Sequence, residues 1–259
     1  MEQKLAERMR ADGPVTGNWV SLSDPTVAEL YAELGFEFVL IDTEHTSSSL
    51  ETVTESIRAV DAATTEAASV VRVPAVDATT IKRVLDLGVD GIMTPMVEGP
   101  DDAAAVVEAV RYPPDGIRGV GAGRANRYGL DLATKLETAN EYLTTIVQIE
   151  TRRGVEQAGA IAVTEGIDSL FVGPADLSHS LGSFADWHGE EYEDAVKRVI
   201  RAGHDADKPV GTLAIGDEQL ERWAAFDFDY VIVGYDVGYH IEGSRHAKET
   251  YESIYDSSE

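Results

Sequence analysis

Residues 68–94, ASVVRVPAVDATTIKRVLDLGVDGIMT, hold one complete strand–helix–strand unit. The runs 68–73 and 89–94 are short and rich in Val and Ile, which is typical of parallel strands buried on both faces. Between them, Asp77 is placed to cap the start of a helix, and Gly88 is placed to end it in a left-handed conformation. The stretch therefore predicts an α/β fold in which a helix connects two parallel strands.

This unit recurs along the chain. Another helix start is visible at Asp24-Pro25, where proline takes the first helical position. Eight strand–helix units in about 250 residues predict a single (β/α)₈ TIM barrel. A doubly wound sheet is the alternative, but no GxGxxG follows the first strand. The predicted strands are residues 17–22, 37–42, 68–73, 89–94, 145–150, 168–173, 209–214 and 229–234.

The chain is expected to form one domain, because no linker or low-complexity tract interrupts the alternation. The C-terminal segment carries Ala247, Tyr251 and Ile254 on one apolar helix face, which we expect to pack on a neighbouring subunit. The predicted parts of the single domain 1–259 are an N-terminal helix at about 2–12, the barrel at about 15–240 and a C-terminal helix at about 241–256.

The composition narrows the class of protein. Of the 259 residues, 43% are hydrophobic, 21 are basic and 47 are acidic, so the net charge is −26. Such a charge repels nucleic acid and anionic membrane, both of which bind basic patches. No apolar run reaches the roughly 18 to 20 residues of a membrane span, and no secretory signal is visible, so we expect a cytoplasmic protein. The absence of cysteine excludes disulfides, thiolate metal sites and a cysteine nucleophile.

The acidic excess has two interpretations. One is a cytosolic protein with an acidic face. The other is a protein adapted to a high-salt cytoplasm, where counter-ions screen the repulsion between its carboxylates. We favour the second, halophilic interpretation because a charge of −26 would destabilise the compact state in dilute buffer.

In a TIM barrel the active site lies at the carboxyl ends of the strands, so the polar residues at those ends are the candidates. After the second predicted strand come Asp42 and His45. A histidine three residues beyond an aspartate can donate its ring N–H to that carboxylate, which makes the other ring nitrogen a better base. A surface histidine with no role is the alternative.

The third predicted strand ends with Arg72 between two valines. A guanidinium in an apolar strand must be paired or must face a ligand, since a buried unpaired charge is very unfavourable. Its planar fork suits a carboxylate or a developing enolate. A structural ion pair with an acid of a neighbouring strand is the alternative.

The fifth predicted strand ends with Gln148 and Glu150, which alternation places on the same side of the strand. The next strand ends in the turn Gly173-Pro174-Ala175-Asp176. Glu150 and Asp176 would therefore meet at one end of the barrel, and two carboxylates without a basic partner suggest a bound Mg²⁺ or Mn²⁺. The alternative is that Asp176 caps the helix that follows.

Two further features bear on function. Segment 111–130 carries four arginines and one acid, which suggests either an anionic substrate or a contact between subunits. None of the six lysines falls inside a predicted strand, where a Schiff-base lysine would be expected. If the protein makes or breaks carbon–carbon bonds, we therefore expect a metal to accept the electrons.

Several motifs together resemble the HpcH/HpaI aldolases, from about residue 15 to 240. They are FVLIDTEH, VVRVP, IKRVLDLGVDGIMTPMV, RYPPDGIRGVG, VQIETRRGVEQ and LFVGPADLSHSLG. The resemblance implies a TIM barrel, a metal-dependent class II pyruvate aldolase that acts on a 2-oxo acid, and a hexamer built as a trimer of dimers. The implied cofactor is Mg²⁺ or Mn²⁺, with Co²⁺ as a further candidate.

The resemblance also implies roles for individual residues. The metal ligands would be Glu150 and Asp176, the base His45 with Asp42 orienting it, and the pyruvate-binding residue Arg72. The other substrate-binding residues would be Gln148 and the backbone of Ala175 and Asp176. The chain departs from the family at IDTEHTSSS, residues 41–49, which leaves the acceptor aldehyde open.

Other activities use the same chemistry. A citramalyl- or malyl-CoA lyase, an oxaloacetate decarboxylase and a macrophomate-synthase-like enzyme also proceed through an enolate. A non-catalytic barrel that binds a 2-oxo acid is the alternative from another class, but such a sensor would not need the base His45.

Overall fold

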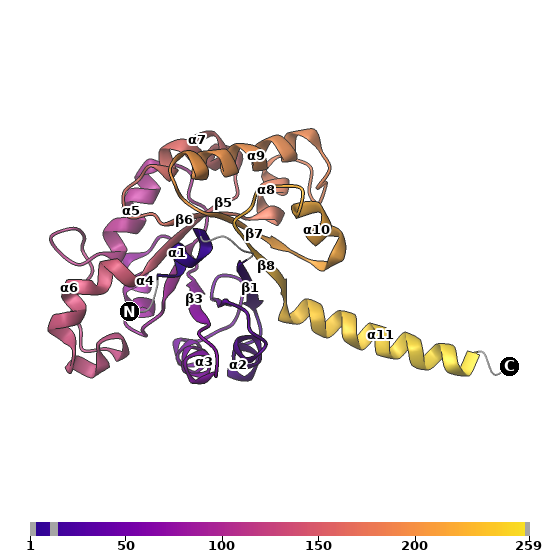
Figure 1. The fold of residues 1–259 in the computed structure, drawn as a ribbon, viewed down its shortest axis with the longest axis horizontal. Coiled ribbons are helices and arrows are strands. Elements are labelled where there is room, and N and C mark those ends of the chain that lie inside the picture. The colour runs from indigo at the N-terminus through magenta and orange to yellow at the C-terminus, as the bar shows by residue number, and fades with distance from the viewer. Residues whose placement is uncertain (1–3, 11–14, 257–259) are drawn as a thin grey trace.

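The computed structural model describes residues 4–10 and 15–256. Its eight strands are all parallel and close into one barrel in chain order, with β1 paired to β8 (Figure 1). This confirms the predicted (β/α)₈ barrel, and every strand lies within three residues of its predicted bounds. The strands are β1 Val15–Val20, β2 Phe38–Asp42, β3 Ala68–Arg72, β4 Gly91–Thr94, β5 Thr144–Ile149, β6 Ser169–Val172, β7 Val210–Ala214 and β8 Tyr230–Tyr235.

Helices follow the strands and cover the outside of the barrel. Parts of the predicted N-terminal helix 2–12 lie outside the described residues, and the rest is α1 Leu5–Arg10. The other helices are α2 Pro25–Glu33, α3 Leu50–Ala62, α4 Ala78–Leu85, α5 Pro100–Val110, a 3₁₀ helix at Arg124–Gly129, α6 Leu132–Tyr142, α7 Arg152–Ala162, α8 Pro174–Ser180, α9 Glu190–Asp205, α10 Gly216–Trp223 and α11 Asp236–Asp256. Among the described residues, no helix is both long and apolar enough to span a lipid bilayer.

The predicted helix ends are confirmed. Asp24 caps α2 by accepting the Thr26 N–H, and Asp77 caps α4 by accepting the Thr80 N–H at 2.7 Å. Gly88, just after α4, has φ +84°, a left-handed conformation that glycine adopts without a steric penalty.

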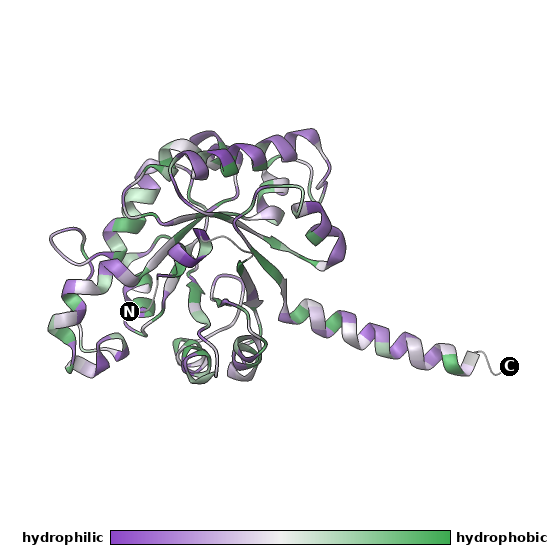
Figure 2. Ribbon diagram, viewed as in Figure 1, coloured by the Kyte–Doolittle hydropathy of each residue, from purple (hydrophilic) through white to green (hydrophobic). Residues whose placement is uncertain are grey.

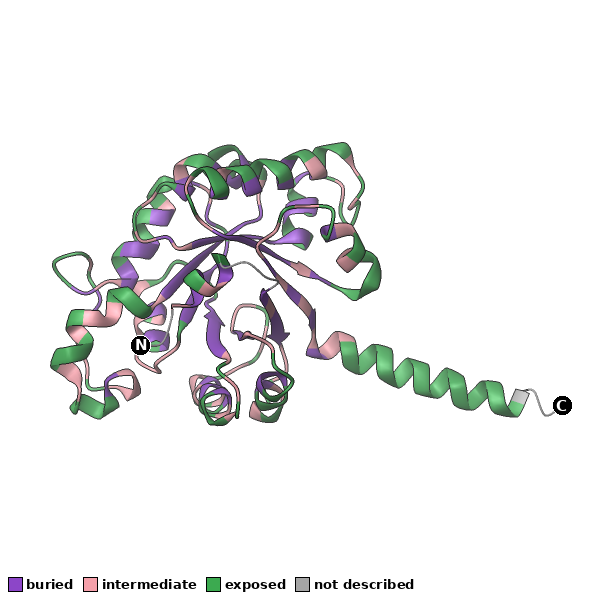
Figure 3. Cartoon of the chain, in the orientation of Figure 1, coloured by how far each residue is buried: buried purple, intermediate pink, exposed green. Residues whose placement is uncertain are grey.

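Two layers of apolar side chains flank the strands, one inside the barrel and one outside it. The ribbon shows the strands to be largely hydrophobic (Figure 2) and buried (Figure 3). The interior layer fills the barrel with side chains such as Leu40, Met93, Ile146 and Phe171. The exterior layer lies between strands and helices, and its members include Ile41. Because neighbours such as Leu40 and Ile41 lie in different layers, strand residues alternate between them, and the polar residues Asp42, Arg72 and Gln148 are in step with the interior layer.

The amino-terminal end of the barrel carries a repeated hydrogen-bonded pair. Just before each of the even strands stands an acid whose carboxylate accepts the backbone N–H of a residue at the start of the preceding strand. The backbone N–H of the same acid donates to the carbonyl oxygen of that residue, so each pair is closed by two bonds. The four pairs are Glu37 with Thr16, Asp90 with Ser69, Asp168 with Thr145 and Asp229 with Val210, with carboxylate bonds of 2.7–2.8 Å.

The last helix, α11, does not cover the barrel. It leaves the end of β8 and projects away from the other elements (Figure 1), and it is exposed from Tyr239 to Tyr255 (Figure 3). Val231 and Val233 of β8 remain partly exposed. Outer residues of other strands, such as Ile92 and Val147, are fully buried in the exterior cluster.

Candidate active site

The barrel mouth, meaning the carboxyl-terminal end of the strands, brings Asp42 and Arg72 together. Their strands pair in register, and both side chains are buried. Arg72 donates from Nε and Nη2 to the two oxygens of Asp42, each at 2.8 Å, and its guanidinium lies 4.4 Å from the ring centroid of Trp19. Trp19 is thus part of the floor beneath Arg72. The ion pair that was an alternative for Arg72 is present, yet only two of its five N–H groups, on Nε and Nη2, donate to a carboxylate among the described residues.

Glu44 is a site residue that the sequence interpretation missed. It follows Asp42 by two positions, and its Oε2 lies 2.7 Å from Arg72 Nη1 as an ion pair without an aligned hydrogen bond. Burial raises the pKa of Glu44, although Arg72 opposes the shift. Strand alternation, which singled out Gln148 and Glu150, was the available signal for Glu44 as well.

His45 is not hydrogen-bonded to Asp42, so that part of the prediction is wrong. The Asp42 carboxylate is occupied by Arg72, which stands directly opposite on β3, and by the backbone N–H of Glu44. The nearest carboxylate to His45 among the described contacts is Glu44, at 3.7 Å from Nε2. The His45 side chain is 71% exposed, so it is accessible at the mouth.

Glu150 follows β5 and is buried. Its Oε1 accepts the backbone N–H of Met96 at 2.7 Å, a contact that no side-chain pattern could have predicted. Burial raises the pKa of Glu150 to about 7, and the negative charges of Asp176 and Glu44 add to the shift, while the Met96 hydrogen bond and Arg72 oppose it. The carboxylate therefore stands where a nearby positive charge would stabilise its ionised form.

Ala175 and Asp176 are exposed in the first turn of α8. The N-cap of α8 is Gly173, and no side chain caps this helix. The alternative role of Asp176 as a helix cap is thus not supported. Its charge instead acts on Glu150 and Glu44 across the barrel mouth.

The residues present fit a divalent cation. Glu44, Glu150 and Asp176 repel one another, and Gln148 Oε1 is buried without a hydrogen-bond partner in the described structure. Carboxylate and amide oxygens are the hard ligands that Mg²⁺ and Mn²⁺ prefer. No group of three or more His, Asp or Glu side chains within residues 4–10 and 15–256 converges on a cation position. A cation held by Glu150 and Asp176 alone would have open positions for substrate and water.

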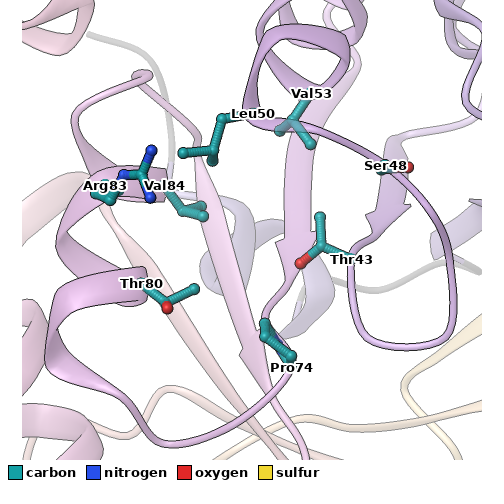
Figure 4. A pocket seen from close by; sticks show the side chains of 8 residues that line it. All are labelled: Thr43, Ser48, Leu50, Val53, Pro74, Thr80, Arg83 and Val84. Carbon is teal, nitrogen blue, oxygen red and sulfur yellow. The ribbon is translucent and has the colours of Figure 1, made fainter.

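A pocket of about 160 Å³ lies beside the mouth (Figure 4). Thr43 and Ser48, from the turn that carries His45, line it together with Pro74 and side chains of α3 and α4, including Arg83. Thr43 follows the interior residue Asp42, so it faces the helix layer. The pocket is thus separated from Glu150 and Asp176 by the barrel wall.

Segment 111–130 does not line the mouth of its own barrel. Arg118 pairs with Asp86, and Arg124 with Asp61 and the Leu87 carbonyl oxygen. These partners stand at or after the ends of α3 and α4, near the start of β4, which is the amino-terminal end of the barrel. Arg111 and Arg127 also pair with acids. None of the six lysines lies on a strand, as the sequence predicts, although Lys4 precedes α1 instead of lying within it.

Comparison with known proteins identifies the class. Residues 16–242 match the family model HpcH/HpaI aldolase/citrate lyase, and the chain belongs to this family. Its relatives include a hydroxypyruvate/pyruvate aldolase of Delftia acidovorans, 39% identical over 231 residues, or 88% of this chain and 85% of that protein. A 4-hydroxy-2-oxovalerate aldolase of Rhodococcus jostii is 39% identical over 220 residues, or 85% and 84% of the two chains.

The fold has a close counterpart among solved structures. A HpcH/HpaI aldolase/citrate lyase family protein from Burkholderia cenocepacia J2315 superposes with a TM-score of 0.90 at 39% identity, over 96% of this chain and 98% of that one. Family and relatives together indicate a class II aldolase, which is a carbon–carbon lyase.

Proposed function

We propose that the protein reversibly cleaves a 4-hydroxy-2-oxo acid to pyruvate and an aldehyde. The observation that carries this proposal is the pair Glu150 and Asp176 at the barrel mouth, beside the buried guanidinium of Arg72. The names of the relatives support a 2-oxo acid as the substrate class.

Glu150 and Asp176 would hold the divalent cation, Mg²⁺ or Mn²⁺, with Co²⁺ as a further candidate. When bound, the cation would supply a Lewis acid for the negative charge that develops on the pyruvate portion of the substrate. Arg72 is already fixed by Asp42 and Glu44. Its remaining N–H groups can donate to the developing enolate oxygen without reorganisation.

The substrate carboxylate would be bound by the backbone N–H groups of Ala175 and Asp176, which open α8. Gln148 contributes a buried amide whose oxygen is unpaired among the described contacts. His45, exposed at the mouth, would remove the proton of the 4-hydroxyl group during cleavage and return it during addition. Asp42 acts on this reaction through Arg72 rather than through His45.

Release of pyruvate from a panel of 4-hydroxy-2-oxo acids tests the proposal, at low and at multimolar salt. We expect activity that a chelator abolishes and added Mg²⁺ or Mn²⁺ restores. Decarboxylation of oxaloacetate without any aldol cleavage would support the decarboxylase alternative. Trapping of a covalent pyruvate adduct by borohydride would contradict the class II mechanism.

We also propose that α11 packs on another copy of the chain, in a hexamer built as a trimer of dimers. The helix exposes Ile241, Tyr251 and Ile254 at 49–63%, and the outer residues Val231 and Val233 of β8 remain partly exposed. A helix from a neighbour would bury both surfaces. Light scattering of the double variant Tyr251→Asp/Ile254→Asp should show a smaller species than the wild type.

The charge of −26 supports a salt-adapted protein. We expect the thermal midpoint to rise as KCl is raised from dilute buffer to multimolar concentration. Full stability without salt would contradict this part of the proposal and leave the catalytic part untouched. A cytoplasmic location stays a prediction.

A further inference from the structure

Met96, immediately after β4, has an unusual backbone conformation. Its φ is +56°, in the left-handed region that residues other than glycine rarely adopt. Its backbone N–H is the donor that reaches Glu150 Oε1 at 2.7 Å. Strained residues of this kind concentrate at functional sites, where the surrounding structure maintains them.

The neighbours of Met96 maintain the strain. Pro95 precedes it, and Val97 follows it with a buried side chain and a backbone N–H that donates to the Gln148 carbonyl oxygen at 3.3 Å. Both β4 and β5 therefore fix the Met96 N–H. The Met96 side chain is half exposed, so it contributes little packing of its own.

Gly173, at the end of β6, closes the opposite side of the same carboxylate. A Cβ atom at this position would lie 2.3 Å from Glu150 Oε2, closer than real Cβ contacts allow, and a tight 3.0 Å from Glu150 Cβ. Its backbone angles, φ −83° and ψ 99°, suit any residue. A Cβ at residue 173 and the present position of the Glu150 carboxylate therefore exclude each other, and the reason is this contact and not the backbone conformation.

We infer that Met96 and Gly173 are positioning residues that fix the Glu150 carboxylate for cation binding. Met96 acts through its backbone, by aiming an N–H at Oε1. Gly173 acts through its missing side chain, by leaving room for Oε2. The inference rests on the proposed role of Glu150 as a metal ligand, and it adds two residues to which no side-chain chemistry points.

The Met96 half is tested by two substitutions with opposite expectations. Asparagine tolerates a left-handed backbone but is polar, whereas valine is apolar but strongly disfavours that conformation. If the backbone matters, Met96→Asn keeps the affinity for Mn²⁺, and Met96→Val weakens it by about 10- to 100-fold. Titration of the full-length protein with Mn²⁺ alone, followed by calorimetry and by the electron paramagnetic resonance of free Mn²⁺, measures both.

The Gly173 half uses a matched glycine. Gly173→Ala should weaken Mn²⁺ binding by about 10- to 100-fold, because Glu150 must turn away from the new methyl group. Gly159, on α7, has no atom within 4 Å of its added Cβ, so Gly159→Ala should leave the Mn²⁺ affinity unchanged. The thermal midpoint of each metal-free variant shows whether the fold persists.

The outcomes separate the inference from the proposed function. Wild-type affinity in both Met96→Val and Gly173→Ala overturns the inference while the metal assignment survives. If Met96→Val keeps the wild-type affinity for Mn²⁺ and Met96→Asn loses it, the backbone role is overturned, because the apolar side chain then matters. A wild-type protein that binds no Mn²⁺ overturns the metal assignment and the inference together. If Met96→Val fails to fold, the Mn²⁺ affinity of Gly173→Ala, compared with that of Gly159→Ala, decides whether the inference holds.

Discussion

The two ends of this barrel use carboxylates in opposite ways. At the amino-terminal end, each of the four acids that precede the even strands accepts a backbone N–H at 2.7–2.8 Å. At the mouth, Glu150 accepts one N–H, Glu44 has an ion pair without an aligned hydrogen bond, and the charges of these acids and Asp176 repel one another.

The difference separates structural carboxylates from functional ones. A carboxylate that accepts aligned donors and faces no other negative charge stabilises the fold, whereas a buried carboxylate that faces other carboxylates lowers stability and persists where function requires it. Asp42 is the exception at the mouth, because Arg72 and the Glu44 N–H satisfy it. Its carboxylate accepts aligned donors, as the four acids at the amino-terminal end do.

The largest expected effect is at Glu150. Glu150→Gln should lower pyruvate release by about a thousandfold, because the ligand charge is lost. The thermal midpoint of the metal-free protein should stay the same or rise, because a buried, repelled charge has been removed. Glu156→Gln is the control, because Glu156 is an exposed residue of α7, the helix that follows Glu150. A large fall in the midpoint of Glu150→Gln would place Glu150 among the structural acids.

The next effect is at His45. His45→Ala should lower turnover by about a hundredfold, which is the lower range for loss of a general base. Stability should not change, because the side chain is 71% exposed and its nearest carboxylate is 3.7 Å away. Steady-state kinetics and thermal melts measure the two quantities, and His188→Ala, an exposed histidine, is the control. Wild-type turnover in His45→Ala would remove His45 from the mechanism.

The amino-terminal end should respond in the opposite way. Asp168→Ala removes the acceptor of the Thr145 N–H and the ion-pair partner of Lys4. We expect a loss of about 1.5–3 kcal/mol in the free energy of unfolding, with normal activity in the folded fraction. Asp227→Ala, at a side chain that is 95% exposed, should change neither. Urea denaturation followed by circular dichroism measures the free energy of unfolding of each variant. If Asp168→Ala and the wild type unfold at the same urea concentration, the hydrogen-bonded pairs at this end contribute nothing to stability.

Much of this comparison could be predicted from the sequence. Strand periodicity gives the barrel and the inward direction of Gln148 and Glu150, because both follow from side-chain alternation. The partner of Asp42 could not be predicted by spacing, since a guanidinium 30 positions away on the next strand competes with the nearby His45. The role that we infer for Met96 depends on its backbone φ angle, which side-chain periodicity does not encode. The direction of α11 was not predicted either, because an exposed apolar face does not say where the helix lies.

The smallest expected effect concerns two neutral hydroxyl groups. It tests whether a buried polar group stabilises the fold only when it has a hydrogen-bond partner. The Tyr192 hydroxyl is buried without a hydrogen-bond partner in the described structure, and its ring packs against the rings of Trp187 and Trp223. The Tyr230 hydroxyl, in contrast, lies 2.8 Å from Ser169 Oγ. Tyr230→Phe should lower the free energy of unfolding by about 1 kcal/mol, whereas Tyr192→Phe should leave it unchanged or raise it slightly. Equal losses in the two variants would mean that Tyr192 has a partner such as a buried water, and that satisfaction within the chain alone does not separate stabilising polar groups from the rest.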